Sequence, residues 1–322
     1  MFLVGNAKAG TVATFRIVEE RIERVQLTEV GVGCSTFTIT DDLVHCAVKE
    51  PSPAIVTLRL DRESGSLTEL SRREIDDPVV YLTMAKNGTL LLGASYDGGW
   101  GDAWPVGPDG VLGLPVGERV EHPNMHCVVA EGDSAWFVSL GADLVAHADL
   151  STGGLMEIRD NTLHLPVGCG PRHLVLDGDE AFLITEYSGE LLKLRRDGAK
   201  LQVTESTPIF SAWSGLSHSR MGADPLNEQL IWGADVHVAG DFVLASERTA
   251  STIASIRDGN VWALSPVQPQ PRGFTVGPDE HHIVVAGEGS GWVSLCRIHD
   301  DGQLQEIWAA DSGAGANWVR FC

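Results

Sequence analysis

Arginine, histidine and glutamate side chains recur at the ends of short apolar segments in this sequence. His126 opens the segment HCVVA, Arg172 precedes HLVL, Glu186 closes AFLITE, and Arg248 follows FVLASE. Arginine pairs well with anionic groups, and histidine or glutamate can transfer a proton near neutral pH. If the fold brings these residues together, they would form a site for an anionic molecule that undergoes proton transfer.

Other catalytic motifs are missing from the sequence. No G-x-S-x-G motif occurs, which argues against a serine acyl-enzyme, and no phosphate-binding P-loop is present. The six cysteines form no C-x-x-C pair, so neither a zinc site nor a disulfide framework is indicated. His122 and His126 have the spacing of a helical zinc motif, but they flank a proline at a strand start. We therefore expect no metal and no cofactor.

The charge balance limits the classes of partner. The chain has 44 acidic and 23 basic residues, a net charge of −21, whereas a nucleic-acid-binding protein would carry a basic stripe. No apolar run is long enough to span a bilayer, and the N-terminus lacks the pattern of a signal peptide. We expect a cytoplasmic protein, monomeric or weakly homo-oligomeric, that binds a small molecule and neither nucleic acid nor membranes.

The elements that must position the ionisable residues are strands. Short runs rich in Val, Leu, Ile and Phe recur, bounded by Gly, Asp, Asn or Ser. One group of four reads HLVL, AFLITE, ELLKLR and LQV. Matching groups lie within residues 35–70, 79–95, 126–158, 235–264 and 273–309. A four-strand unit of about 40 to 50 residues is typical of a propeller blade.

The two ends of the chain complement each other. Residues 2–27 supply three strands without an inner strand, and the C-terminal NWVRFC stands where an inner strand is due. Pairing of this last strand into the first blade would close a ring of seven and cover two sheet edges. We predict an all-β, seven-bladed β-propeller of four-stranded blades, with residues 1–322 as a single domain and residues 205–233 as a polar insertion. A pair of β-sandwiches is the alternative, and the sustained blade period disfavours it.

In such a fold many polar groups meet at one mouth of the central channel. The inner and second strands of a blade are antiparallel, so the start of one and the end of the other share a face. Inner-strand starts supply His126, Arg172, His173, His237, Arg272 and Asn317. Second-strand ends supply Glu50, Tyr96, Ser139, Glu186, Glu247, Arg248 and Glu288. Convergent polar groups in a concave site are the default active-site hypothesis, and the same pairing predicts that Arg172 lies near Glu186.

Several strings resemble a known family over essentially the whole chain. HPNMHCVV (122–129), VGCGPRHLVL (167–176), ADVHVAG (234–240) and PRGFTVG (271–277) resemble the 6-phosphogluconolactonase-like, seven-bladed propeller lactonases. That family includes 3-carboxy-cis,cis-muconate lactonising enzymes, and its members act on lactones that bear an anionic group. The resemblance implies an enzyme, a lactonase that hydrolyses an anionic sugar-derived lactone of the 6-phosphogluconolactone type.

The resemblance also implies roles for single residues. His126, Arg172, Glu186 and Arg248 match the family's catalytic positions. Residues expected to bind the substrate are Asn124, His173, His237 and Arg272. Thr185 and Glu247 stand where the family usually has asparagine, which leaves the identity of the lactone open.

The expected mechanism is attack of water on the ring ester. Glu186 or His126 would take the proton of the water, while Arg172 and Arg248 would neutralise the oxyanion and hold the anionic substituent. A cycloisomerase that forms a lactone from a carboxymuconate-type dicarboxylate would use the same residues. A non-catalytic propeller that binds a metabolite or a protein would keep the arginines, but it would not need both His126 and Glu186.

Overall fold

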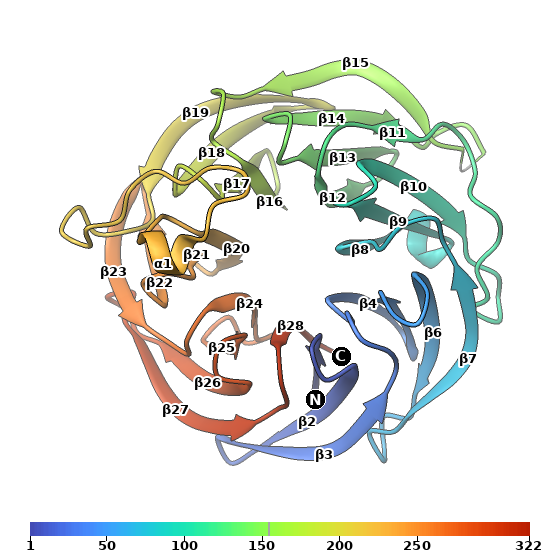
Figure 1. Cartoon of the computed structure of the whole chain (residues 1–322), viewed down its shortest axis with the longest axis horizontal. Coiled ribbons are helices and arrows are strands. Elements are labelled where there is room, and N and C mark those ends of the chain that lie inside the picture. The colour runs from blue at the N-terminus through green and yellow to red at the C-terminus, as the bar shows by residue number, and fades with distance from the viewer. Residues whose placement is uncertain (154) are drawn as a thin grey trace.

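Seven four-stranded antiparallel sheets form a ring in the computed structural model, which describes residues 1–153 and 155–322 (Figure 1). Neighbouring inner strands contact each other all the way round the ring axis. The architecture confirms the predicted all-β, seven-bladed propeller. We number the blades from the N-terminus and name the strands of a blade A to D from the axis outward.

The strand bounds follow this order from blade 1 to blade 7. The A strands are β28 (Ala316–Phe321), β4 (Thr36–Thr40), β8 (Tyr81–Ala85), β12 (Met125–Glu131), β16 (Pro171–Asp177), β20 (Gly233–Ala239) and β24 (Pro271–Val276). The B strands are β1 (Phe2–Asn6), β5 (Leu43–Val48), β9 (Leu90–Ser95), β13 (Ser134–Ser139), β17 (Glu180–Thr185), β21 (Phe242–Glu247) and β25 (His282–Gly287).

The outer two strands complete each blade. The C strands are β2 (Thr11–Val18), β6 (Ala54–Leu60), β10 (Trp100–Pro105), β14 (Leu144–Asp149), β18 (Glu190–Asp197), β22 (Thr252–Arg257) and β26 (Trp292–Ile298). The D strands are β3 (Arg21–Glu29), β7 (Leu67–Glu74), β11 (Val120–Glu121), β15 (Glu157–His164), β19 (Lys200–Pro208), β23 (Asn260–Pro266) and β27 (Leu304–Asp311). Two short helices, η1 (Lys86–Gly88) and α1 (Pro225–Glu228), lie in connections.

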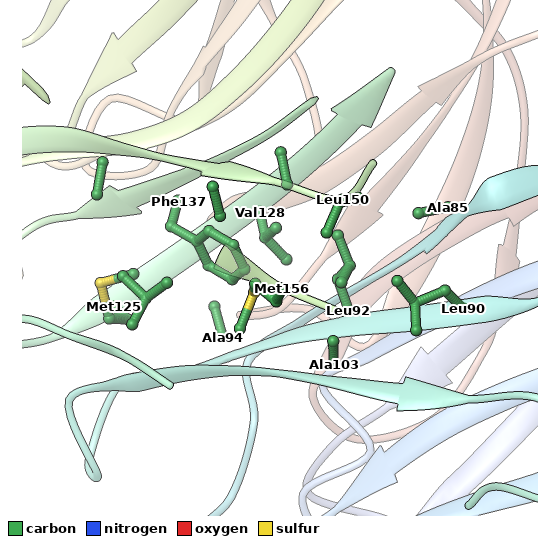
Figure 2. Packing of buried hydrophobic residues seen from close by; sticks show 14 of the residues in the cluster. Ala85, Leu90, Leu92, Ala94, Ala103, Met125, Val128, Phe137, Leu150 and Met156 are labelled. Atoms are coloured by element: carbon green, nitrogen blue, oxygen red, sulfur yellow. The ribbon is translucent and has the colours of Figure 1, made fainter. Parts of the chain in front are cut away.

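The hydrophobic core lies between the blades. Among the described residues, each of the seven interfaces between neighbouring blades has its own buried apolar cluster. Figure 2 shows the cluster between blades 3 and 4, where Phe137 and Met156 pack among Leu92, Ala94 and Ala103. A B strand is covered by a blade on each side, so both of its faces are apolar and it reads as a continuous apolar run. The outermost strands face solvent and are mostly polar.

The C-terminal strand closes the ring as predicted. β28 pairs antiparallel with β1, and Val319 stands opposite Val4. Trp318 donates a hydrogen bond from its indole N–H to the Phe37 carbonyl at 2.8 Å, which ties β28 to blade 2. The two chain ends therefore lie together in blade 1 (Figure 1). No A strand of blade 1 exists without this pairing, so the closure depends on residues more than 300 positions apart in sequence.

Two predicted boundaries were wrong. The group predicted at residues 126–158 was expected to include the whole outer strand of blade 4, but β15 runs from Glu157 to His164, and Met156 packs in the core instead. The insertion predicted at residues 205–233 begins later, because β19 continues to Pro208 along β18. None of the helices in the described parts of the chain has the length and apolar character needed to cross a lipid bilayer.

Candidate active site

The A strands of five blades carry one extra residue near their first residues. The A–B register shifts by one at Asn317, His126, Arg172–His173, Ala234–Asp235 and Arg272. Blades 2 and 3 show no such shift between their A and B strands. A bulge bends a strand and re-aims its side chains, and bulges are frequent next to active sites. We call the end of the ring where the A strands start and the B strands end the mouth.

The bulge in β16 brings Arg172 against Glu186. The Arg172 Nε–H donates to Glu186 Oε2 at 2.8 Å, which confirms the predicted proximity. Glu186 follows the last residue of β17, and its backbone is fixed on both sides. Its N–H donates to the Gly170 carbonyl at 2.6 Å, and its own carbonyl accepts from Gly233 at 3.0 Å. Both partners are glycines, and a Cβ at Gly233 would lie 2.3 Å from the Thr185 carbonyl oxygen.

Arg248 is the second cation on the same carboxylate. Its Nη2 lies 2.9 Å from Glu186 Oε2, and its side chain, like that of Arg172, is only 2% exposed. The guanidinium stacks on the Trp232 ring, with Cζ 3.7 Å from the ring centroid. The Trp232 indole N–H also donates to Glu186 Oε1 at 3.3 Å. Glu186 thus accepts hydrogen bonds from Arg172 and from the indole, and it forms ion pairs with both arginines.

The electrostatic state of Glu186 follows from these neighbours. Burial alone would raise the pKa of this carboxyl, but Arg248, Arg172 and Arg272 outweigh burial and hold the pKa below its usual value. The carboxylate is therefore ionised at neutral pH. Two buried arginines share this one carboxylate as their ion-pair partner among the described residues, so the group favours a further anion.

His126 is buried at the mouth, and neither of its ring nitrogens hydrogen-bonds to another described residue. It is 5% exposed, and Nδ1 has no hydrogen-bond partner in the described chain. Its ring centroid lies 5.7 Å from that of Tyr96 and 5.2 Å from that of His173. Burial, reinforced by Arg172, lowers the pKa of His126 well below 6.5. The imidazole is therefore neutral and has a free lone pair.

Asp235 contacts both His173 and His237. The sequence pattern did not indicate Asp235 as a site residue. His173 Nδ1 lies 2.7 Å from one carboxylate oxygen of Asp235, and His237 Nε2 lies 3.2 Å from the other. His237 was expected at the start of its strand, but β20 begins at Gly233, so His237 lies further along the strand. The motif ADVHVAG contains Asp235, yet only the bulge brings its side chain to His173.

Other predicted mouth residues differ in what they contact. Arg272 pairs with Glu288 at 3.4 Å, in the positions of blade 7 that match Arg172 and Glu186 in blade 5. The Asn124 amide donates to the Tyr96 carbonyl at 3.4 Å. Asn317 is 2% exposed, and its Oδ1 has no hydrogen-bond partner among the described residues.

Three residues predicted at the mouth form no hydrogen bond or ion pair with the arginine–glutamate cluster through their side chains. Ser139 donates to the Pro123 carbonyl at 2.6 Å and so ties the end of its strand to a connection. Glu247 is fully buried and accepts backbone N–H groups of Trp232, at 2.7 Å, and Ala250, at 2.5 Å. Glu50 is exposed and its side chain pairs with no described residue.

The long connection between blades 5 and 6 supplies residues that sequence reasoning missed. Residues 209–232 carry Trp232 and Met221, whose sulfur accepts hydrogen bonds at 3.3 Å from the hydroxyls of both Tyr96 and Tyr187. The length of this connection is visible in the sequence, because it interrupts the regular spacing of the blades. An aromatic residue immediately before a site strand was the available signal for Trp232.

No group of three or more His, Cys, Asp or Glu side chains suited to a metal ion occurs among the described residues. The groups that do converge are two buried arginines on an ionised carboxylate, a neutral histidine, and a second arginine–glutamate pair. This set can bind an anion, accept a proton from water and stabilise an oxyanion.

Comparisons with known proteins point to one family. The family model "Lactonase, 7-bladed beta-propeller" matches residues 2–321. A 6-phosphogluconolactonase of Pectobacterium carotovorum is 26% identical over 84% of this chain and 82% of the relative. One of Pectobacterium atrosepticum is 26% identical over 92% and 90%.

Solved structures share the fold. The periplasmic gluconolactonase of Pseudomonas aeruginosa has a TM-score of 0.87 with this chain at 19% identity, over 99% of this chain and 98% of that one. The family match extends over nearly every residue, and the related sequences are lactonases. The chain therefore belongs to the seven-bladed β-propeller lactonase family and is a lactonase-type carboxylic ester hydrolase.

Proposed function

We propose that this lactonase hydrolyses a lactone bearing a phosphate or carboxylate, of the 6-phosphogluconolactone type, at the mouth of the ring. The observation that carries the proposal is the buried pair Arg172 and Arg248 on the single carboxylate of Glu186. Arginines this deeply buried need an anionic partner, and these two share one carboxylate among the residues that the structure describes. The 6-phosphogluconolactonases among the relatives support the phosphorylated sugar class.

Glu186 is proposed as the base that takes a proton from the attacking water. Protonation of Glu186 removes a negative charge beside Arg172 and Arg248 at the moment when the lactone carbonyl gains one. The total charge of the cluster then stays constant, and the arginines turn from the carboxylate to the oxyanion. Protonation of His126 would instead add a cation near three arginines, which already disfavour it.

Collapse of the tetrahedral intermediate completes the reaction. The ring C–O bond breaks, the proton held by Glu186 passes to the departing ring oxygen, and the product is the open hydroxy acid. His126, with its free lone pair, is proposed to hydrogen-bond the attacking water. Arg272, His237 and Asn124 are proposed to contact the anionic substituent and the hydroxyl groups of the substrate.

The test is a screen of the purified protein against matched lactones in buffer that contains EDTA. The panel pairs a phosphorylated sugar lactone with its unphosphorylated form and adds carboxylated muconolactones. We expect the kcat/KM for an anionic lactone to exceed that for its neutral form by at least about tenfold, the value of one charged hydrogen bond. Equal rates for the two forms, or a need for added metal, would contradict the proposal.

The pH dependence of hydrolysis is a second prediction. A base works when deprotonated, so activity falls as the pH drops through its pKa, and the pKa values of Glu186 and His126 are both lowered. We therefore expect kcat/KM to stay level from about pH 7.5 down to about pH 5.5. Initial rates on a carboxylated lactone, corrected for spontaneous hydrolysis, give the profile, because a phosphate group would itself titrate at about pH 6. An acid limb centred near 6.5, the ordinary histidine value, would rule out this assignment of the base.

A further inference from the structure

Arg172 has most of its hydrogen-bond donors already committed. Its Nε–H donates to Glu186 at 2.8 Å, while Nη1 donates to the Ala234 carbonyl and lies over the His173 ring, 3.1 Å from Nε2 and 3.5 Å from Nδ1. Nη2 makes no hydrogen bond to a described residue and is not among the fully buried unpaired atoms. The guanidinium is thus held on two edges and has one nitrogen to spare for a ligand.

Asp235 is the best-satisfied carboxylate at the mouth. It is 2% exposed, and it accepts the backbone N–H groups of Val236 at 3.0 Å and Phe274 at 3.2 Å besides its two histidine contacts. It therefore joins blade 5, through His173, to blades 6 and 7. Burial alone would raise the pKa of Asp235, but the two histidines hold it well below its usual range. An ionised carboxylate can only accept hydrogen bonds.

The partners of His173 determine where its proton sits. Asp235 only accepts, so the Nδ1 that faces it at 2.7 Å must carry the hydrogen. Arg172 Nη1 lies over the face of the ring, within 3.5 Å of both nitrogens, where a cation favours the neutral ring over the imidazolium. Burial, reinforced by Arg172, lowers the pKa of His173 to about 3, so the ring is neutral and has one proton for these two nitrogens. The contact with Asp235 and the single proton leave one tautomer, with hydrogen on Nδ1 and a lone pair on Nε2.

We infer that Asp235 and His173 are positioning residues for Arg172, an inference that rests on the proposed role of Arg172 in binding the substrate. Asp235 holds the neutral His173 ring in place through its Nδ1–H, and Arg172 Nη1 packs on the face of that ring. That contact and the Ala234 carbonyl set the plane of the guanidinium, so that Nε meets Glu186 and Nη2 stays free. His173 acts on the reaction through Arg172 and does not touch the substrate.

A double-mutant cycle tests the chain of contacts. Asp235→Asn should lower kcat/KM by about 10- to 100-fold, the range for hydrogen-bonded neighbours. Arg172→Lys should lower it further, since lysine lacks the planar fork. Because both changes remove the same positioning, the double variant should be no worse than Arg172→Lys alone within about threefold. His173→Gln in place of Asp235→Asn gives the same test if the first variant fails to fold.

The control variant is Ser246→Ala. Ser246 is buried beside Asp235 and accepts only its backbone N–H, at 3.0 Å, so this change leaves the carboxylate and His173 in place. It should alter kcat/KM by less than about threefold even if it lowers the melting temperature. Losses that multiply in the double variant would overturn the inference and leave Asp235 as a purely structural residue.

The tautomer gives a readout that does not depend on activity. In protein labelled with ¹⁵N-histidine, long-range ¹H–¹⁵N spectra should show His173 protonated on Nδ1, with the signal assigned through His173→Gln. A wild-type ring protonated on Nε2 would overturn the inference whatever the enzyme hydrolyses. Inactivity toward the whole lactone panel, with the Nδ1 tautomer present, would instead overturn the proposed function.

Discussion

Glu186→Gln is expected to lower kcat by about 10²- to 10⁴-fold, the usual range for a positioned proton-transfer group. Glutamine keeps the shape of the side chain and can still accept from Arg172 at 2.8 Å or from the Trp232 indole. It cannot take a proton from water, and it leaves Arg172 and Arg248 without their anion. Substrate binding should therefore persist, and KM should rise far less than kcat falls.

Glu288→Gln is the matched control for this substitution. Glu288 holds the same position in blade 7 that Glu186 holds in blade 5, but it pairs with one arginine, at 3.4 Å. We expect its kcat to change by no more than a few-fold, with the melting temperature showing that both variants fold. If the folded Glu186→Gln variant turns over substrate at nearly the wild-type rate, Glu186 is not the base, and its contact with Arg172 is a structural ion pair.

Arg172→Ala should change KM as well as kcat, unlike Glu186→Gln. The arginine is proposed to meet the anionic substituent and the oxyanion, so both KM and kcat should worsen. A fall in kcat with an unchanged KM would mean that Arg172 does not contribute to substrate binding.

Removal of the closing strand has the largest expected effect on stability. Deletion of residues 316–322 takes Trp318, Val319 and Ala316 out of the core and exposes the edge of β1 and apolar side chains of the two neighbouring blades. Each large buried side chain contributes about 1.5–3 kcal/mol, so the sum approaches the whole stability of an ordinary domain. We expect the truncated chain to be insoluble or molten at room temperature.

A single substitution keeps the test measurable if the truncated chain cannot be purified. Trp318→Ala should cost about 3–5 kcal/mol and lower the melting temperature by about 10 °C. Trp213→Ala is its control, because Trp213 is 95% exposed. The melting temperature of this control should equal that of the wild type. Melting of Trp318→Ala within a degree or two of that control would mean that β28 does not carry the closure.

The sequence alone determined the fold and much of the site. A B strand packed between two blades must be apolar on both faces, so each blade has a readable apolar run at a regular period. An edge without a partner strand is costly, so the lone C-terminal NWVRFC had to pair with the N-terminal strands, as β28 does with β1. Antiparallel pairing of their strands then predicts that Arg172 lies beside Glu186, as it does.

The tertiary structure decided how the site residues are aimed. Whether an A strand bulges depends on how it packs against its neighbours, and no pattern in the sequence marked the extra residues at His126, Arg172–His173 and Asp235. Regular strands would send Arg172 and His173 to opposite faces, so their contact exists only through the bulge. Trp232 likewise reaches Glu186 because Glu247 holds its backbone N–H. The first contact lies within one bulged strand of blade 5, and the second joins blade 5 to the connection that leads into blade 6. The geometry of both follows from ring packing, which local sequence does not encode.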